Sequence, residues 1–177
     1  DWEIESMKLY LGTLTILCAG ALAAQTAASV SADTKGLYDG VKNNVVKAAE
    51  KMPEENYGFK PVETVRSFGQ LVGHVADANY MFCSAVKGEK APVSGIEKGK
   101  SAKADLVQAL KDSVAYCDAV YTGMTDAAGS QTVNFFRRDR TKISMLNFNT
   151  SHTNEHYGNI VTYMRLKGLV PPSSAPR

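Results

Sequence analysis

The chain has 177 residues, of which 44% are hydrophobic and 21% are charged. This balance excludes a collagen-like or wholly disordered chain, and the length fits one domain that buries roughly two thirds of its unfolded surface. The net charge of +2 comes without a long run of Lys or Arg, so no nucleic-acid partner is expected.

The N-terminal segment is typical of a secretory signal peptide. We interpret residues 1–6, which precede the first methionine, as an upstream remnant. Residues 7–32 begin with Met7 and the positively charged Lys8, and an apolar run then leads into small residues with candidate cleavage sites after Ala23 and Ala32. A membrane anchor is the alternative, but the run is shorter than the roughly 20 residues that a span needs. We expect cleavage after Ala32, export to the periplasm or the medium, and no remaining membrane anchor.

Residues 33–177 are predicted to form a single all-α domain. Apolar side chains recur there at helical spacing, with no alternation that favours strands. The predicted helices cover residues 34–52, 67–86, 101–124 and 141–167. Pro53 ends the first helix, and Gly168 ends the last. Four amphipathic helices in one small domain predict a four-helix bundle, with irregular stretches at 87–100 and 125–140.

The stretch 87–100 is long enough to cross the whole bundle. Fully extended, it reaches about 45 Å, whereas a 20-residue helix is about 30 Å long. The second and third helices can therefore run parallel, which places Cys83 and Cys117 near one level. A disulfide and a pair of buried free thiols both remain open at this point.

The chain contains three histidines, and all of them fall on predicted core positions. His152 and His156 are four residues apart and share one helix face, while His74 is in line with Leu71 and Ala78. Three neutral imidazoles that converge in a bundle would form a metal site with open coordination positions. The alternative is that they are ordinary core or surface histidines.

Residues 152–156 also spell H-x-x-E-H, the inverted zincin pattern, in which Glu155 would be the general base of a protease. This motif lies close to the C-terminus and leaves little chain for a further ligand and a substrate cleft. We therefore favour the helical bundle over a protease.

Three stretches resemble the DinB-like superfamily. They are GHVADANY at 73–80, HTNEHYGNIVTYMR at 152–165 and, more weakly, AEKMP at 49–53. The resemblance implies an up-down-down-up bundle with Zn or Ni held by His74, His152 and His156. It also implies the activity of a thiol-dependent transferase or isomerase that uses bacillithiol or mycothiol. The predicted export would separate this chain from those cytosolic thiols, so the substrate stays open.

The sequence therefore predicts a metal-dependent hydrolase or transferase with a small-molecule substrate. In this interpretation Glu155 accepts a proton, and Asp77 orients an imidazole as a hydrogen-bond acceptor, while Tyr80 and Asn159 line the pocket. The alternatives are a surface carboxylate for Glu155, a solvated carboxylate paired with a base for Asp77, and simple packing for Tyr80 and Asn159. The alternative function is a non-catalytic, exported metal- or ligand-binding bundle protein. A homodimer is a further expectation, because bundles of this size often pair.

Overall fold

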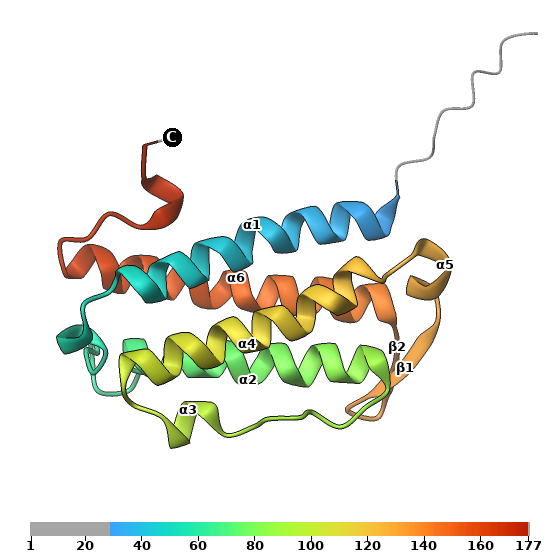
Figure 1. Ribbon diagram of the computed structural model, residues 1–177, viewed down its shortest axis with the longest axis horizontal. Helices are drawn as coiled ribbons and strands as arrows, with labels where there is room; N and C mark the ends of the chain where they lie inside the picture. Colours follow the sequence, from blue (N-terminus) through green and yellow to red (C-terminus); the bar gives the residue numbers. More distant parts are fainter. Residues whose placement is uncertain (1–28, 177) are drawn as a thin grey trace, which may run out of the picture.

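The computed structural model describes residues 29–176, and four long helices dominate it (Figure 1). These are α1 Val30–Lys51, α2 Phe68–Lys87, α4 Lys103–Thr122 and α6 Lys142–Leu166. The shorter elements are η1 Glu54–Asn56, α3 Ile96–Gly99, α5 Asp126–Gly129, β1 Thr132–Phe135, β2 Arg138–Thr141 and η2 Pro172–Ser174. The predicted four-helix bundle is confirmed.

The four long helices follow an up-down-down-up order. Helices α1 and α6 run in one direction, and α2 and α4 run in the other (Figure 1). Each of them packs against two of the other three, with α2 against α4 and α6, and α1 against the same two helices. The parallel pair α2 and α4 requires a long connection, and residues 88–102 return along the bundle to provide it, carrying α3.

Helix α1 begins earlier than the predicted residue 34. Ser29 caps it with its side chain, and Val30 is the first helical residue. The amide of Ser31 donates to Asp126 Oδ1 over 2.8 Å, and the Ser29 hydroxyl donates to the same oxygen over 3.1 Å. This start is therefore anchored to α5. Residues 1–6, and most of the predicted signal peptide at 7–32, lie outside the described residues.

The prediction of an irregular segment over 125–140 was wrong in part, because β1 and β2 form an antiparallel hairpin there. Its turn places Phe136 and Arg137 at φ values of 49° and 63°. Such turns usually carry Gly, Asn or Asp, which adopt this left-handed backbone at low cost. The usual sequence signal for a hairpin is thus absent here.

The start of α2 is closely specified. Ser67 and Gln70 form a reciprocal capping box, in which each side chain accepts from the backbone of the other residue. The helix ends at Gly88, whose φ of 74° is the left-handed conformation that favours glycine. Because both ends of α2 are fixed in this way, the position of His74 along the bundle axis is fixed as well.

The core lies between the four helices. At one end, Tyr38 of α1 and Tyr121 of α4 stack with ring centroids 3.9 Å apart. Nearby, Cys83 and Cys117 form a disulfide that joins α2 to α4 across a Cα–Cα distance of 5.5 Å, with both residues fully buried. Of the two alternatives left open above, the structure adopts the disulfide.

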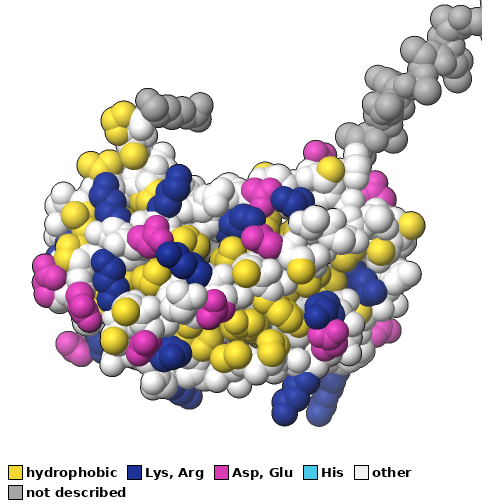
Figure 2. All heavy atoms as spheres, viewed as in Figure 1, with side chains coloured by type: hydrophobic (Ala, Val, Ile, Leu, Met, Phe, Trp, Pro, Cys, Tyr) yellow, Lys and Arg dark blue, Asp and Glu magenta, His cyan; other side chains and the backbone are white. Residues whose placement is uncertain are grey.

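The outer surface carries charges of both signs. Basic and acidic side chains are interspersed over the face shown in Figure 2. Within residues 29–176, no helix is both long and apolar enough to cross a membrane.

Candidate metal centre

The three histidines meet between α2 and α6. His74 projects from α2, and His152 and His156 project from successive turns of α6. The Nε2 atom of His152 lies 3.2 Å from Nε2 of His74 and 3.2 Å from Nε2 of His156. One nitrogen from each ring can be chosen so that all three lie within 4.8 Å of one another. The side chains predicted as ligands are therefore brought together.

Burial keeps two of these imidazoles neutral. It is the largest cause that lowers the pKa of His152 to about 4, followed by the neighbouring His156 and His74. Burial also leads for His156, whose pKa falls to about 4 with help from His74 and then Arg66. At neutral pH both rings therefore keep a lone pair that can bind a metal.

The arrangement fits a divalent cation better than it fits hydrogen bonds. In a neutral His74 the single ring proton lies on Nδ1 and is donated to Glu97, so Nε2 carries a lone pair. A neutral His152 has at most one Nε2 proton and cannot donate it to both neighbours at once. With metal–nitrogen bonds of 2.0–2.1 Å in a tetrahedral site, ligand nitrogens lie about 3.3 Å apart. The two 3.2 Å separations match this spacing.

Glu97 of α3 orients His74. The Nδ1–H of His74 donates to Glu97 Oε2 over 2.8 Å, and Nε of Arg66 donates to Glu97 Oε1 over 2.8 Å. Burial acts to raise the pKa of Glu97, but the hydrogen bonds from Arg66 and His74 outweigh it, so the pKa lies below its usual value. The ionised carboxylate assigns the tautomer of His74 and leaves Nε2 free for a metal.

The predicted acceptor for an imidazole was Asp77, and the structure gives that place to Glu97. Asp77 instead accepts from the backbone N–H groups of Ile96 and Glu97, over 3.0 and 2.9 Å. It therefore fixes α3, and acts on His74 only through Glu97. A Cβ at Gly73 would lie 2.8 Å from Cα of Glu97, so α3 approaches α2 this closely because Gly73 has no side chain.

His152 and His156 have no comparable partner. Their Nδ1 atoms are buried and have no hydrogen-bond partner among the described residues. Glu97 is thus the one carboxylate in the described chain that is hydrogen-bonded to the triad. Sequence reasoning missed it because α3 lies in the stretch 87–100, where no periodicity reports which residue faces α2.

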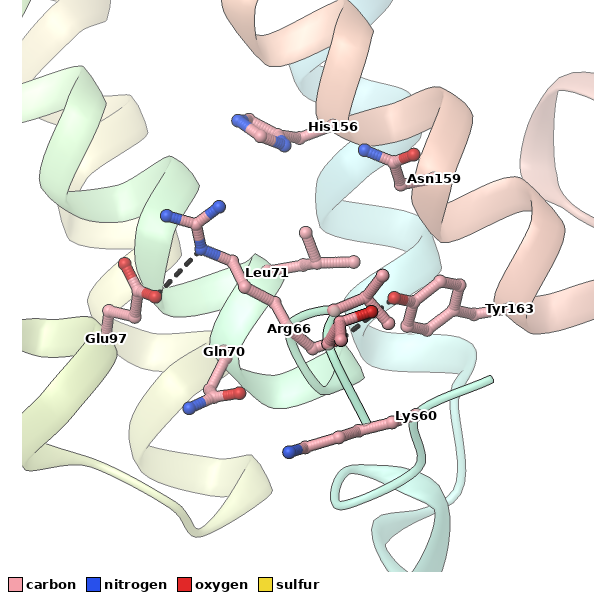
Figure 3. A pocket seen from close by; sticks show the side chains of 10 residues that line it. Lys60, Arg66, Gln70, Leu71, Glu97, His156, Asn159 and Tyr163 are labelled. Atoms are coloured by element: carbon pink, nitrogen blue, oxygen red, sulfur yellow. Dashed lines mark hydrogen bonds and ion pairs between the residues drawn. The ribbon is translucent and has the colours of Figure 1, made fainter. Parts of the chain in front are cut away.

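A cavity of about 570 Å³ opens beside the histidines (Figure 3). Its polar lining comprises Lys60, Thr64, Arg66, Gln70, Glu97, His156, Asn159 and Tyr163. The loop before α2, the first turn of α2, the helix α3 and the C-terminal half of α6 supply these side chains. A small molecule in this cavity would contact His156 directly.

The other predicted site residues are spread more widely. Asn159 is part of the cavity lining. Tyr80 is buried in the core against Tyr116, with ring centroids 5.4 Å apart, and does not line this cavity. Glu155 is exposed and also lies outside the cavity lining, although its charge acts to raise the pKa of His152. A role for Glu155 as a proton acceptor stays a prediction.

Residues 37–160 match the family model of the DinB superfamily. A related sequence is YjoA of Bacillus subtilis (strain 168), which is 26% identical over 131 residues, covering 72% of this chain and 84% of YjoA.

Solved structures share the fold. A DinB-like protein from Bacillus cereus ATCC 10987 superposes with a TM-score of 0.69 at 17% identity, covering 78% of this chain and 93% of that one. YjoA gives a TM-score of 0.67 at 23% identity, covering 82% and 99%. A mycothiol-dependent maleylpyruvate isomerase gives 0.60 at 18% identity, covering 73% of this chain and 60% of the isomerase.

Proposed function

Because this chain belongs to the DinB superfamily, we propose that it is a divalent-metal-dependent hydrolase or transferase that acts on a small molecule. The observation that carries the proposal is the convergence of three imidazoles whose Nε2 atoms, when all three rings are neutral, cannot all be paired by hydrogen bonds. Zn and Ni both suit three imidazole ligands. When bound, such a cation supplies Lewis-acid chemistry, which polarises a carbonyl or acidifies a thiol or water.

The protein's own residues prepare the centre. Glu97 holds the proton of His74 on Nδ1, and Asp77 holds Glu97 in place through two backbone amides. Burial keeps His152 and His156 unprotonated at neutral pH. His152 and His156 therefore present lone pairs before a metal arrives, and the neutral tautomer of His74 that Glu97 favours presents a third, so little reorganisation accompanies binding.

The number of ligands favours catalysis over a structural clip. Structural zinc sites usually have four protein ligands, whereas catalytic sites have three and an open position. In the part of the chain that the structure describes, the metal-ligating group comprises the three histidines, and a cavity borders it at His156. The similar isomerase is described as mycothiol-dependent, so thiol transfer should be screened first, beside hydrolysis.

The test is the metal content of the chain purified without a polyhistidine tag. We expect about one equivalent of Zn or Ni per chain, lost in a His152→Ala, His156→Ala double variant. The control is Asn154→Ala, an exposed position on the same helix, which should keep the metal. Absence of stoichiometric metal after Zn and Ni are added back, in protein whose helical circular dichroism is intact, would refute the metalloenzyme.

We also propose export, which two features support. Residues 7–32 have the pattern of a signal peptide, and the buried disulfide suits an oxidising compartment. Cleavage after Ala32, the expected site, would remove the Ser29 cap and the Ser31–Asp126 bond. Cleavage after Ala23 leaves both intact. The intact mass of secreted protein tests the expected site, which gives a chain that begins at residue 33; a chain that begins at residue 24 would show cleavage after Ala23 instead.

A further inference from the structure

Arg66 is held at the rim of the cavity with part of its guanidinium open. Its backbone carbonyl accepts from the Tyr163 hydroxyl over 2.8 Å, and its Nε donates to Glu97 over 2.8 Å. Among residues 29–176, neither terminal nitrogen of Arg66 has a hydrogen-bond partner, and 42% of the side chain is exposed. The group is therefore fixed in position while two N–H-bearing nitrogens stay available for a ligand.

The open edge of Arg66 lies close to the histidines. In Figure 3 its guanidinium points toward the side of the cavity on which His156 lies. A group bound to Arg66 would therefore hold the rest of its molecule beside the triad.

The cavity is positively charged. The negative charge of Glu97 is already matched by Arg66 and accepts the proton of His74. Lys60, also in the lining, has only a 3.6 Å ion pair with Glu63, whose side chain is 95% exposed and which therefore offers little compensation. A cation held by three neutral imidazoles would keep its full charge. These charges favour an anionic ligand.

The available donors suit a carboxylate better than a phosphate. Helix N-termini bind phosphates through free backbone N–H groups. At the start of α2 the first three N–H groups are already used, by the carbonyls of Phe59 and Tyr57 and by the Ser67 side chain. What remains is one guanidinium edge, whose two parallel N–H groups match the two oxygens of a carboxylate.

We propose that the substrate of this site is a small carboxylate-bearing molecule, which the terminal nitrogens of Arg66 bind with its reacting group toward His74, His152 and His156. The cavity volume of about 570 Å³ suits such a molecule. This inference rests on the proposed function for the chemistry at the histidines, but the contact between Arg66 and the carboxylate does not require the metal.

The test measures binding of benzoate, its neutral analogue benzamide, and inorganic phosphate to the metal-loaded protein by calorimetry at fixed ionic strength. We expect benzoate to bind at least ~10-fold more tightly than benzamide, and to lose ~10-fold or more in Arg66→Gln and Arg66→Lys. Arg165→Gln is the matched control, because Arg165 is exposed on α6 and its Nη2 donates to Ser174, outside the cavity lining.

The metal-free His152→Ala, His156→Ala variant separates this inference from the proposed function. Benzoate binding that persists in this variant, and depends on Arg66, supports the carboxylate receptor even if the wild-type chain holds no metal. Loss of benzoate binding in this variant, while it stays folded, would overturn the inference, because the carboxylate would then be a metal ligand. Equal benzoate affinity in wild type and Arg66→Lys, or phosphate binding as tight as benzoate, would also overturn it.

Discussion

The proton on Nδ1 of His74 is the smallest feature on which the metal centre depends. Glu97 holds it there as an ionised acceptor, and Arg66 keeps that acceptor ionised. His152 and His156 have no such partner among the described residues and are fixed by packing. The three ligands are therefore not equivalent, and changes at Glu97 should act on the metal chiefly through His74, the ring to which it is hydrogen-bonded.

We expect Glu97→Gln to weaken metal binding about 10-fold, because a neutral amide is a poorer acceptor for the imidazole proton and lowers the basicity of the ligand. Chelator competition measures the change. Glu89→Gln is the control, since Glu89 lies in the same connection but 54% of its side chain is exposed and it pairs with Lys87. An unchanged affinity in Glu97→Gln would show that Glu97 does not tune the site.

The metal-stripped protein should lose stability as the pH falls from about 6.5 to 4. In the unfolded chain both histidines have pKa values near the ordinary 6.5, whereas burial lowers the pKa of His152 and His156 to about 4 in the folded state. Between these values the unfolded chain binds more protons, so acid favours unfolding. Denaturant unfolding at pH 7 and pH 5 measures this. The double alanine variant should show a flatter dependence; an identical slope in both proteins would contradict the assignment.

At the scale of elements, the short helix α3 approaches α2 very closely and thereby places Glu97 against His74. Gly73 makes room for it, and Asp77, one turn later on α2, accepts its first two backbone N–H groups.

The sequence predicted the histidines because they lie on long helices with clear apolar faces. It did not predict Glu97, because the register of a connection against a helix depends on tertiary contacts. The β1–β2 hairpin was not predicted either, because its turn positions hold Phe136 and Arg137 instead of the Gly or Asn that usually indicates such a turn.

Gly73→Ala should displace α3, because the new Cβ would lie 2.8 Å from Cα of Glu97, a backbone atom that cannot swing aside. We expect a loss of about 1–3 kcal/mol in the free energy of unfolding, together with weaker metal binding. Denaturant unfolding and chelator competition report the two effects. Gly40→Ala is the control, because nothing lies within 4 Å of its added Cβ, and it should be neutral or stabilising by up to about 1 kcal/mol. Full stability of Gly73→Ala would show that α3 can move without cost.

At the scale of the whole molecule, the up-down-down-up order makes α2 and α4 parallel, and only this arrangement brings Cys83 and Cys117 to one level near the same end of the bundle. The long connection that the order requires also delivers Glu97 to the histidines. The fold and the centre are therefore linked through one segment, residues 88–102.

Reducing the disulfide should destabilise the protein by about 4 kcal/mol, which is the loop-closure entropy for cysteines separated by 34 residues. Denaturant unfolding with and without a phosphine reductant measures it, after the reductant has acted on the unfolded chain, because both cysteines are buried. A Cys83→Ala, Cys117→Ala variant should not respond to the reductant. Identical midpoints for oxidised and reduced wild type would argue against the bond.

The covalent ring closed by Cys83 and Cys117 has a consequence for a cleaved chain. A protease that cuts at the exposed Lys90 would leave His74 on one fragment and both His152 and His156 on the other. Cys83 belongs to the first fragment and Cys117 to the second, so the bond still joins them. The nicked protein would remain a two-chain molecule that keeps both halves of its metal centre together, and a gel would separate the two fragments only under reducing conditions.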